Sequence, residues 1–168
     1  AQAEADANMT AHWKVEKGSI IFDGKGRSLQ TTRDYRDFEM LVDWKITPKG
    51  DSGIYLRGTP QVQIWDPRGD DSPRAAKGSG GLFNNKGEGN AKDPIVNADH
   101  IAGDWNRFRI VMIDERVHVF LNGKLVVKNT ILENFWDRTQ PPLRQGPIEL
   151  QAHGSLLWFR NIYIREIQ

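Results

Sequence analysis

Residues 38–46 read Phe38-Glu39-Met40-Leu41-Val42-Asp43-Trp44-Lys45-Ile46. Large apolar side chains occupy every second position with mostly polar ones between them, which is the pattern of a strand with one buried face. Similar short runs lie on both sides of this stretch, separated by turn residues. The clearest turn is Asn122-Gly123, because this pair readily adopts the positive φ angles of a two-residue hairpin. Many short strands at this spacing predict an all-β sandwich or barrel.

The other predicted strands cover residues 13–15, 19–22, 28–31, 52–57, 61–65, 105–113, 116–121, 124–128, 146–153 and 156–166. No stretch has a convincing helical period, so no helix is expected. A chain of 168 residues fits one domain with a real core. We expect a single sandwich domain over residues 13–168. Residues 1–12 are expected to be an N-terminal tail or the end of a fragment, because they have no starting Met and no signal-peptide pattern.

Composition narrows the class of ligand. Hydrophobic residues make up 38% of the chain and charged residues 27%, which argues against disorder and against a membrane-embedded protein. The net charge is +1, and the dispersed Lys and Arg residues form no basic stripe for nucleic acid. The absence of cysteine excludes disulfides, thiolate metal sites and cysteine nucleophiles. A neutral or weakly charged ligand fits best, and the oligomeric state is left open.

Two irregular inserts interrupt the strand pattern. Residues 66–103 are rich in glycine and proline, and loops of this length are usually functional or disordered. We expect an ordered loop beside the site, anchored in its middle by Leu82-Phe83. No cofactor is specified, but a divalent cation such as calcium is compatible with Asp66, Asp70 and Asp71. The second insert, residues 133–144, contains Trp136.

Polar side chains recur on one face of several predicted strands. In residues 146–153, Ile148, Leu150 and Ala152 are expected to face inward. The residues expected on the outward faces are Tyr55, Arg57, Gln61, Gln63, Trp65, Glu149, Gln151 and His153. If the strands are neighbours, these amides, charges and rings converge on one surface that suits the hydroxyls and C–H faces of a sugar.

Simpler explanations exist for the same residues. The Glu149, Gln151, His153 alternation is compatible with the solvated face of an ordinary strand, although Gln and His are poor choices for solubility alone. Trp65 and Trp136, each taken alone, are compatible with core or rim packing. Asp51 is explained by a turn. No role is assigned to the remaining histidines: His12, His100 and His118.

Several enzyme classes lack their motifs here. The chain has no His-Glu-x-x-His, no EF-hand loop, no phosphate loop and no Gly-x-Ser-x-Gly elbow. Retaining glycosidases need two carboxyl groups about 5–5.5 Å apart. The strand with Gln61 and Gln63 offers amides where such a pair would sit, which disfavours ordinary two-carboxylate hydrolysis.

An ordered set of motifs resembles a known family. They are Asp37-Phe38-Glu39, Gly50-Asp51-Ser52-Gly53-Ile54-Tyr55-Leu56-Arg57-Gly58, Gln61-Val62-Gln63-Ile64-Trp65-Asp66, Gly103-Asp104-Trp105-Asn106, Leu121-Asn122-Gly123, Gly146-Pro147-Ile148-Glu149-Leu150-Gln151, His153-Gly154 and Phe159-Arg160-Asn161-Ile162. Over residues 13–166 the chain resembles the 3-keto-disaccharide hydrolase domain of bacterial secreted proteins.

The resemblance implies a concanavalin A-like jelly roll of two antiparallel sheets with a concave carbohydrate face. It also implies action on sugars oxidised at C3, and a periplasmic or extracellular location. The sequence departs from the family at Gln61, where a Glu is frequent, and it lacks the family's opening Asn-Gly-Lys run. The first departure puts a catalytic or metal-binding role at position 61 in doubt.

A C3 ketone acidifies the proton on C2, so a modest base removes it, the C1 substituent departs and water then adds. Such a reaction needs one base and a donor for the enolate oxygen. His153 is the candidate base, because imidazole titrates near neutral pH. Glu149 would orient it or bind a cation, and Arg57 would stabilise the enolate. The expected substrate-binding residues are Tyr55, Gln61, Gln63, Trp65, Trp136 and Gln151.

Three functions remain open from the sequence. The first is a 3-keto-glycoside hydrolase, and the second is a carbohydrate-binding module that uses the same face without turnover. The third is an interaction domain that contacts a protein through the large loop. The fold alone does not choose between them. A titratable group among convergent amides favours the enzyme.

Overall fold

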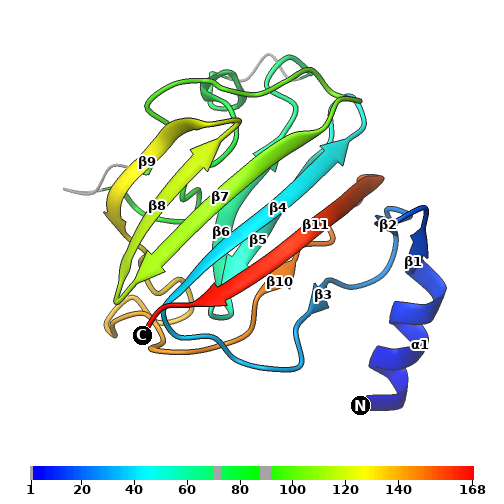
Figure 1. The fold of residues 1–168 in the computed structure, drawn as a ribbon, viewed down its shortest axis with the longest axis horizontal. Helices are drawn as coiled ribbons and strands as arrows, with labels where there is room; N and C mark the ends of the chain where they lie inside the picture. Colours follow the sequence, from blue (N-terminus) through cyan, green and yellow to red (C-terminus); the bar gives the residue numbers. More distant parts are fainter. Residues whose placement is uncertain (1, 70–72, 88–91) are drawn as a thin grey trace.

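The alternating stretch forms β4 (Phe38–Ile46), the middle strand of a seven-stranded antiparallel sheet. The computed structural model describes residues 2–69, 73–87 and 92–168. From edge to edge, the strands of this sheet are β1 (Trp13–Glu16), β2 (Ser19–Phe22), β11 (Leu157–Glu166), β4, β7 (Asn106–Ile113), β8 (Arg116–Leu121) and β9 (Lys124–Ile131). Figure 1 shows these strands side by side across the molecule.

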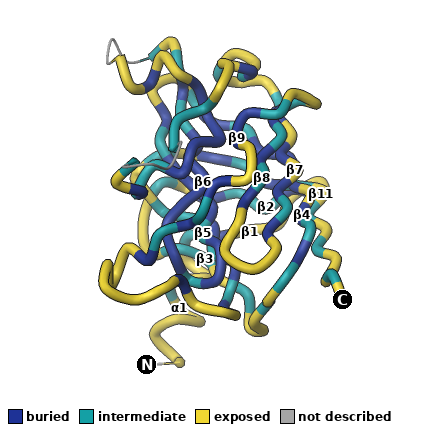
Figure 2. Tube along the Cα trace, turned by 90° about the vertical axis from the view of Figure 1, so that its left-hand side faces the viewer, coloured by how far each residue is buried: buried dark blue, intermediate teal, exposed yellow. Residues whose placement is uncertain are grey.

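A second sheet of four antiparallel strands packs against the first. Its order is β3 (Leu29–Gln30), β10 (Glu149–Leu150), β5 (Asp51–Leu56) and β6 (Thr59–Trp65). The apolar positions of both sheets meet between the layers, where the trace in Figure 2 is buried. Met40 and Val42 from the large sheet, and Ile54 and Val62 from the small one, are fully buried there. The predicted jelly-roll sandwich is therefore confirmed.

Local sequence signals predict the β8–β9 turn correctly but overestimate the length of the strand at residues 146–153. Asn122 and Gly123 have φ angles of 50° and 81° at the β8–β9 hairpin, as the Asn-Gly pair predicts. The predicted strand at residues 146–153 is much shorter, because only Glu149–Leu150 is regular. Pro147 lacks the N–H that a longer ladder would need. Ile148 and Leu150 are buried as expected, and Ala152 packs partly buried against the core.

The N-terminal segment corrects the expectation that the chain contains no helix. Residues Gln2–His12 form α1, in which no residue is buried, and Figure 2 shows it exposed beside the sandwich. Its alternate alanines favour the helix by propensity. It has no apolar face, so periodicity did not reveal it. Asn8 Oδ1 accepts from the Arg27 N–H at 3.0 Å, and His12 Nδ1 lies 3.0 Å from Asp23.

The long insert lies against the edge of the small sheet. Leu82 is fully buried and bridges to Val62 of β6. The Gln63 N–H donates to the Gly81 carbonyl at 2.9 Å, and the Gln63 carbonyl accepts from the Gly80 N–H at 2.8 Å. The described parts of the insert are thus ordered, with Leu82 as the predicted anchor. They also include one 3₁₀ turn, Ala75–Lys77. No helix in the described ranges is long and apolar enough to cross a membrane.

Candidate active site on the four-stranded sheet

The strand register places the predicted polar residues on one surface. Glu149 of β10 pairs with Tyr55 of β5, and Gly53 of β5 pairs with Gln63 of β6. Their neighbours Ile54, Val62 and Leu150 point into the core, so the intervening side chains share the outer face. We call this surface the polar face. It carries Asp51, Tyr55, Gln61, Gln63, Trp65, Glu149 and Gln151.

A chain of directed hydrogen bonds crosses the polar face. The Gln61 amide Nε2 donates to Gln63 Oε1 at 2.6 Å, and Gln63 Nε2 donates to Asp51 Oδ1 at 2.7 Å. The carboxylate at one end only accepts, so it fixes the orientation of both amides. Gly53 makes this arrangement possible, because a Cβ there would lie 2.6 Å from Gln61 Oε1.

Asp51 connects this chain to the predicted base. His153 is exposed at the edge of the polar face, and its Nδ1 lies 3.6 Å from Asp51 Oδ2. This separation suits an ion pair but is too long for a hydrogen bond. The expected partner of His153 was Glu149, whereas the structure places Asp51 beside it. Extending the predicted strand 52–57 by one residue would have put Asp51 on the same face as Tyr55.

Burial disfavours charge on two carboxyl groups of the polar face. It raises the pKa of Asp51, although His153 and the Gln63 amide oppose the shift. Burial likewise raises the pKa of Glu149, opposed only by a hydrogen bond from the Ser28 hydroxyl. Carboxyl groups with raised pKa values are frequent at functional sites, where proton transfer near neutral pH is needed.

The polar face also contains unpaired hydrogen-bond acceptors. In the described part of the chain, Gln61 Oε1 and Gln151 Oε1 are buried without a partner. An unsatisfied buried acceptor costs about 1–3 kcal/mol, which a hydroxyl reaching it would offset. The Gln151 amide donates to the Tyr55 hydroxyl over 3.4 Å. Burial raises the pKa of Tyr55, so this phenol keeps its proton and remains a donor.

Two tryptophans, Trp65 of the polar face and Trp136 beside it, have indole N–H groups bonded to backbone carbonyls. The Trp65 indole N–H donates to the Gly78 carbonyl at 2.8 Å, and its ring meets Phe83 edge-on at 5.5 Å. Phe83 was expected only to anchor the loop, yet its ring lies beside Trp65. Trp136 lies at the β5–β6 hairpin, where its indole N–H donates to the Gly58 carbonyl at 2.8 Å.

The side chain of Arg57 lies away from the polar face. It is 3% exposed and bridges the two sheets at one end of the sandwich. Nε donates to the Arg36 carbonyl, and Nη2 donates to Asp37 Oδ1 at 2.9 Å. Nη1 donates to the Asp114 and Leu143 carbonyls. These partners correct the expectation that Arg57 joins the amides of the polar face, because its guanidinium is bound at the end of the sandwich.

A cavity of about 500 Å³ lies next to this guanidinium. Its lining includes Arg36, Asp37, Asp114, Arg116, Pro142 and Arg144. None of the described residues that line it belongs to the polar face. We therefore place the candidate site by hydrogen bonding and charge, not by cavity volume.

Of the three aspartates that the sequence suggested for a divalent cation, only Asp66 lies within the described residues. Asp66 accepts from the backbone N–H groups of Lys49 and Arg68, each at 3.0 Å, which is the role of a turn-forming aspartate. Asp70 and Asp71 lie outside the described residues. Within the described ranges, no group of three or more His, Asp or Glu side chains is placed to hold a metal ion.

The chain is similar to a curated protein and to several solved structures. A curated 3-keto-disaccharide hydrolase of Bacteroides thetaiotaomicron is 24% identical over 91% of this chain and 69% of its own length. A solved "Putative glycosyl hydrolase" of Parabacteroides distasonis is 25% identical, with a TM-score of 0.73 over 94% of this chain and 91% of its own. The carbohydrate-binding module CBM66 of Bacillus subtilis is 12% identical with a TM-score of 0.56, covering 92% and 91%, and shows the same fold.

The match to a family model covers nearly the whole chain. It spans residues 2–165, and so includes α1 and every strand of the polar face. The chain therefore belongs to the family of 3-keto-alpha-glucoside-1,2-lyase-like domains.

Proposed function

We propose that this domain acts on 3-keto-glycosides by removing the C2 proton, expelling the C1 substituent and adding water. The observation that carries the proposal is the pairing of His153 with Asp51 at the end of the Gln61–Gln63 chain. This arrangement offers one titratable base, one carboxylate to orient it, and amides for hydroxyl groups. The reaction needs no second carboxylate.

The reaction passes through an enolate and an unsaturated ketone. His153 takes the proton from C2, and the electron pair forms an enolate with the C3 carbonyl. The enolate then collapses to an unsaturated ketone as the C1–O bond breaks, and the leaving alkoxide takes a proton. Water adds at C1 and C2 regains a proton, so the net change is hydrolysis of the glycosidic bond.

Tyr55 is the proposed donor to the enolate oxygen. Its hydroxyl lies on the polar face next to Gln151 and stays protonated. A positioned donor of this kind typically contributes about 10²–10³-fold to the rate. Tyr55 thus takes the role that the sequence suggested for Arg57, whose N–H groups are bound elsewhere.

Asp51 acts on His153 through its charge and position. Its carboxylate lies close enough to favour the imidazolium that forms when the C2 proton is taken. The two amides behind Asp51 hold the carboxylate in place. Asp51 is therefore a positioning residue for the base.

Proton exchange at C2 tests the proposal directly. The purified domain is incubated with a 3-keto-disaccharide in D₂O, and deuterium at C2 and release of the leaving sugar are followed by NMR. We expect turnover of the keto sugar and none of its parent. His153→Ala is expected to lower both signals by about 10²–10⁴-fold, the usual contribution of a general base.

The same assay contains the outcomes that contradict the proposal. Binding of the keto sugar and its parent without exchange or release would identify a carbohydrate-binding module. Undiminished exchange in His153→Ala would remove this residue as the base. His118→Ala, at a half-buried histidine of β8 in the large sheet, is the matched control and should retain wild-type turnover.

A further inference from the structure

Trp136 has an unusual environment for a large aromatic side chain. It is 63% exposed, yet its indole N–H is held by the Gly58 carbonyl at 2.8 Å. Phe135 packs against it edge-on, with ring centroids 5.0 Å apart. A ring that is both exposed and fixed loses little conformational entropy when a ligand stacks on it. Trp136 therefore has the properties of a binding platform.

The position of Trp136 sets its distance from the base. Gly58 lies between β5 and β6, at the end of the hairpin farthest from Asp51, the first residue of β5. β5 has six residues, so its ends are roughly 17 Å apart by the strand rise. This is about the length of three linked pyranose rings. The backbones of Tyr55 and Gln61 lie toward the Gly58 end, and the Tyr55 hydroxyl lies 3.4 Å from the amide of Gln151, two residues before His153.

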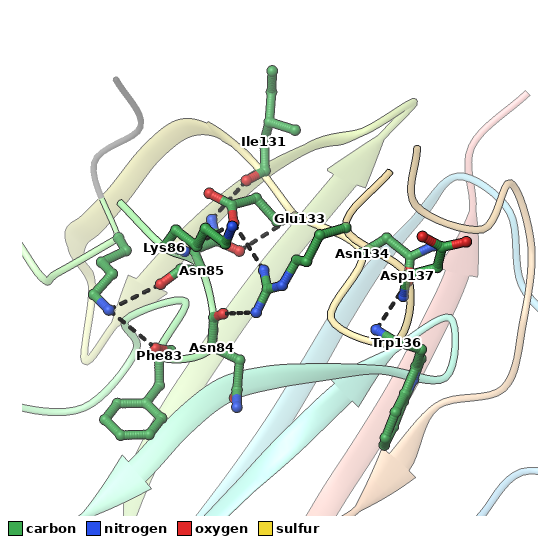
Figure 3. A network of polar contacts seen from close by, with 11 residues as sticks. Phe83, Asn84, Asn85, Lys86, Ile131, Glu133, Asn134, Trp136 and Asp137 are labelled. Atoms are coloured by element: carbon green, nitrogen blue, oxygen red, sulfur yellow. Dashed lines mark hydrogen bonds and ion pairs between the residues drawn. The ribbon is translucent and has the colours of Figure 1, made fainter. Parts of the chain in front are cut away.

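Arg138 holds the loop that carries Trp136. Its Nη1 donates to Glu133 Oε2 at 2.8 Å, and its Nη2 donates to the Asn84 carbonyl at 2.6 Å. Its guanidinium also lies over the ring of Phe135, 5.3 Å from the centroid. Arg138 thus contacts both the support of Trp136 and the large loop. In Figure 3 the side chains of Asn84 and Trp136 both point away from this hydrogen-bond network, in the same direction.

A second set of bonds strengthens the connection (Figure 3). The Glu133 N–H donates to Asn85 Oδ1 at 3.0 Å, and Asn85 Nδ2 donates to the Ile131 carbonyl at 2.8 Å. The Lys86 N–H donates to Glu133 Oε2 at 2.8 Å. Leu82, just before this segment, bridges to β6. The network therefore fixes the Trp136 loop to the edge of the polar face.

We infer that the polar face binds a sugar chain of about three pyranose rings, with its last ring on Trp136 and with Arg138 as the residue that positions this distal subsite. The orientation rests on the proposed function, which puts the oxidised ring at His153. The leaving group is then an oligosaccharide of more than one ring, and the substrate class is a glycan oxidised at C3 of its non-reducing end.

The number of rings in the sugar substrate is the variable that tests the subsite. Wild-type protein and variants are assayed with a 3-keto methyl glycoside and with a 3-keto trisaccharide oxidised on its terminal ring. We expect Trp136→Ala to raise KM for the trisaccharide by about tenfold and to leave the methyl glycoside unchanged. Arg138→Ala should have the same selectivity, because it frees the loop without removing the ring.

Matched controls come from the outer face of the large sheet. Tyr163 is 65% exposed, and Arg165 pairs there with Glu39. Tyr163→Ala and Arg165→Ala should leave KM for both substrates unchanged. An equal rise in KM for both substrates in Trp136→Ala and Arg138→Ala, or no rise for the trisaccharide, would overturn the inference.

A binding experiment separates this inference from the proposed reaction. Calorimetry with the unoxidised trisaccharide and its methyl monosaccharide needs no turnover. Tighter binding of the trisaccharide, lost in Trp136→Ala, would support the subsite even if no 3-keto sugar is turned over. Equal affinity of wild-type protein for the two sugars would overturn the subsite whatever the catalytic result.

Discussion

Glu149 is a half-buried carboxyl group on the polar face, and no described basic side chain forms an ion pair with it. Its folded-state pKa is raised, because burial disfavours the charged form more than the Ser28 hydroxyl favours it. An acid with a raised folded pKa binds its proton more tightly in the folded state than in the unfolded one. It therefore costs stability once the pH rises above the ordinary Glu value of 4.5.

Glu149→Gln is predicted to stabilise the protein at neutral and higher pH. The amide keeps the hydrogen-bonding shape and removes the charge. The gain in unfolding free energy should be present at about pH 8 and disappear toward about pH 4, where the wild-type carboxyl is protonated. Urea unfolding at both pH values measures it. A gain of equal size at both pH values, or a loss at the higher one, would contradict the assigned cause.

At the scale of elements, the β5–β6 hairpin shows why a glycine occupies the middle of a strand. Gly53 lies opposite Gln63, and the Gln61 amide lies over it, with Oε1 only 2.6 Å from where a Cβ would be. A side chain at this position would push the amide away from Gln63. The missing Cβ is therefore part of the polar site.

Gly53→Ala is predicted to weaken sugar binding by about tenfold and to cost about 1–3 kcal/mol of stability through overpacking. The double variant Gly53→Ala, Gln61→Ala separates the two effects. It removes the colliding amide, so stability should recover while sugar affinity does not. Affinity is measured by calorimetry, and recovery of both quantities in the double variant would mean that Gln61 has no part in binding.

Strand patterns predict faces better than they predict contacts. The alternation in residues 61–65 and 146–153 correctly placed Gln63 and Glu149 on the face of the small sheet that points away from the core, although Gln63 is buried there. It did not predict that Asp51 would meet His153, because His153 lies past the end of β10 where no ladder fixes its direction. Arg57 follows the last residue of β5 and has a φ of 53°, so the strand alternation no longer applied to it.

At the scale of the whole molecule, Arg57 joins the two sheets at one end. Its guanidinium comes from the small sheet, and it donates to Asp37 at the start of β4 and to the Asp114 carbonyl between β7 and β8. Asp37 Oδ1 also accepts from the Asp114 N–H at 2.9 Å. No residue pattern in the sequence indicated this bridge, because its partners are up to 86 residues away along the chain.

Arg57→Met tests whether this residue belongs to the fold or to the reaction. Met fills much of the same volume but removes the guanidinium bonds to Asp37 and to three carbonyls, so that Asp37 keeps only the Asp114 N–H of these donors. We expect a loss of about 3 kcal/mol in unfolding free energy, as when one partner of a buried ion pair is removed. Arg165→Met, at an exposed pair, should cost at most about 1 kcal/mol. Thermal and urea unfolding provide the comparison.

Activity measured well below the unfolding temperature distinguishes a structural Arg57 from a catalytic one. If Arg57 only joins the sheets, the folded fraction of Arg57→Met should turn over a 3-keto sugar at close to the wild-type rate, since His153 and Tyr55 lie on the polar face and do not contact the guanidinium. A donor to the enolate would instead lower kcat by about 10²–10³-fold without any change in the folded fraction. That result would return Arg57 to the active site and remove Tyr55 as the sole donor.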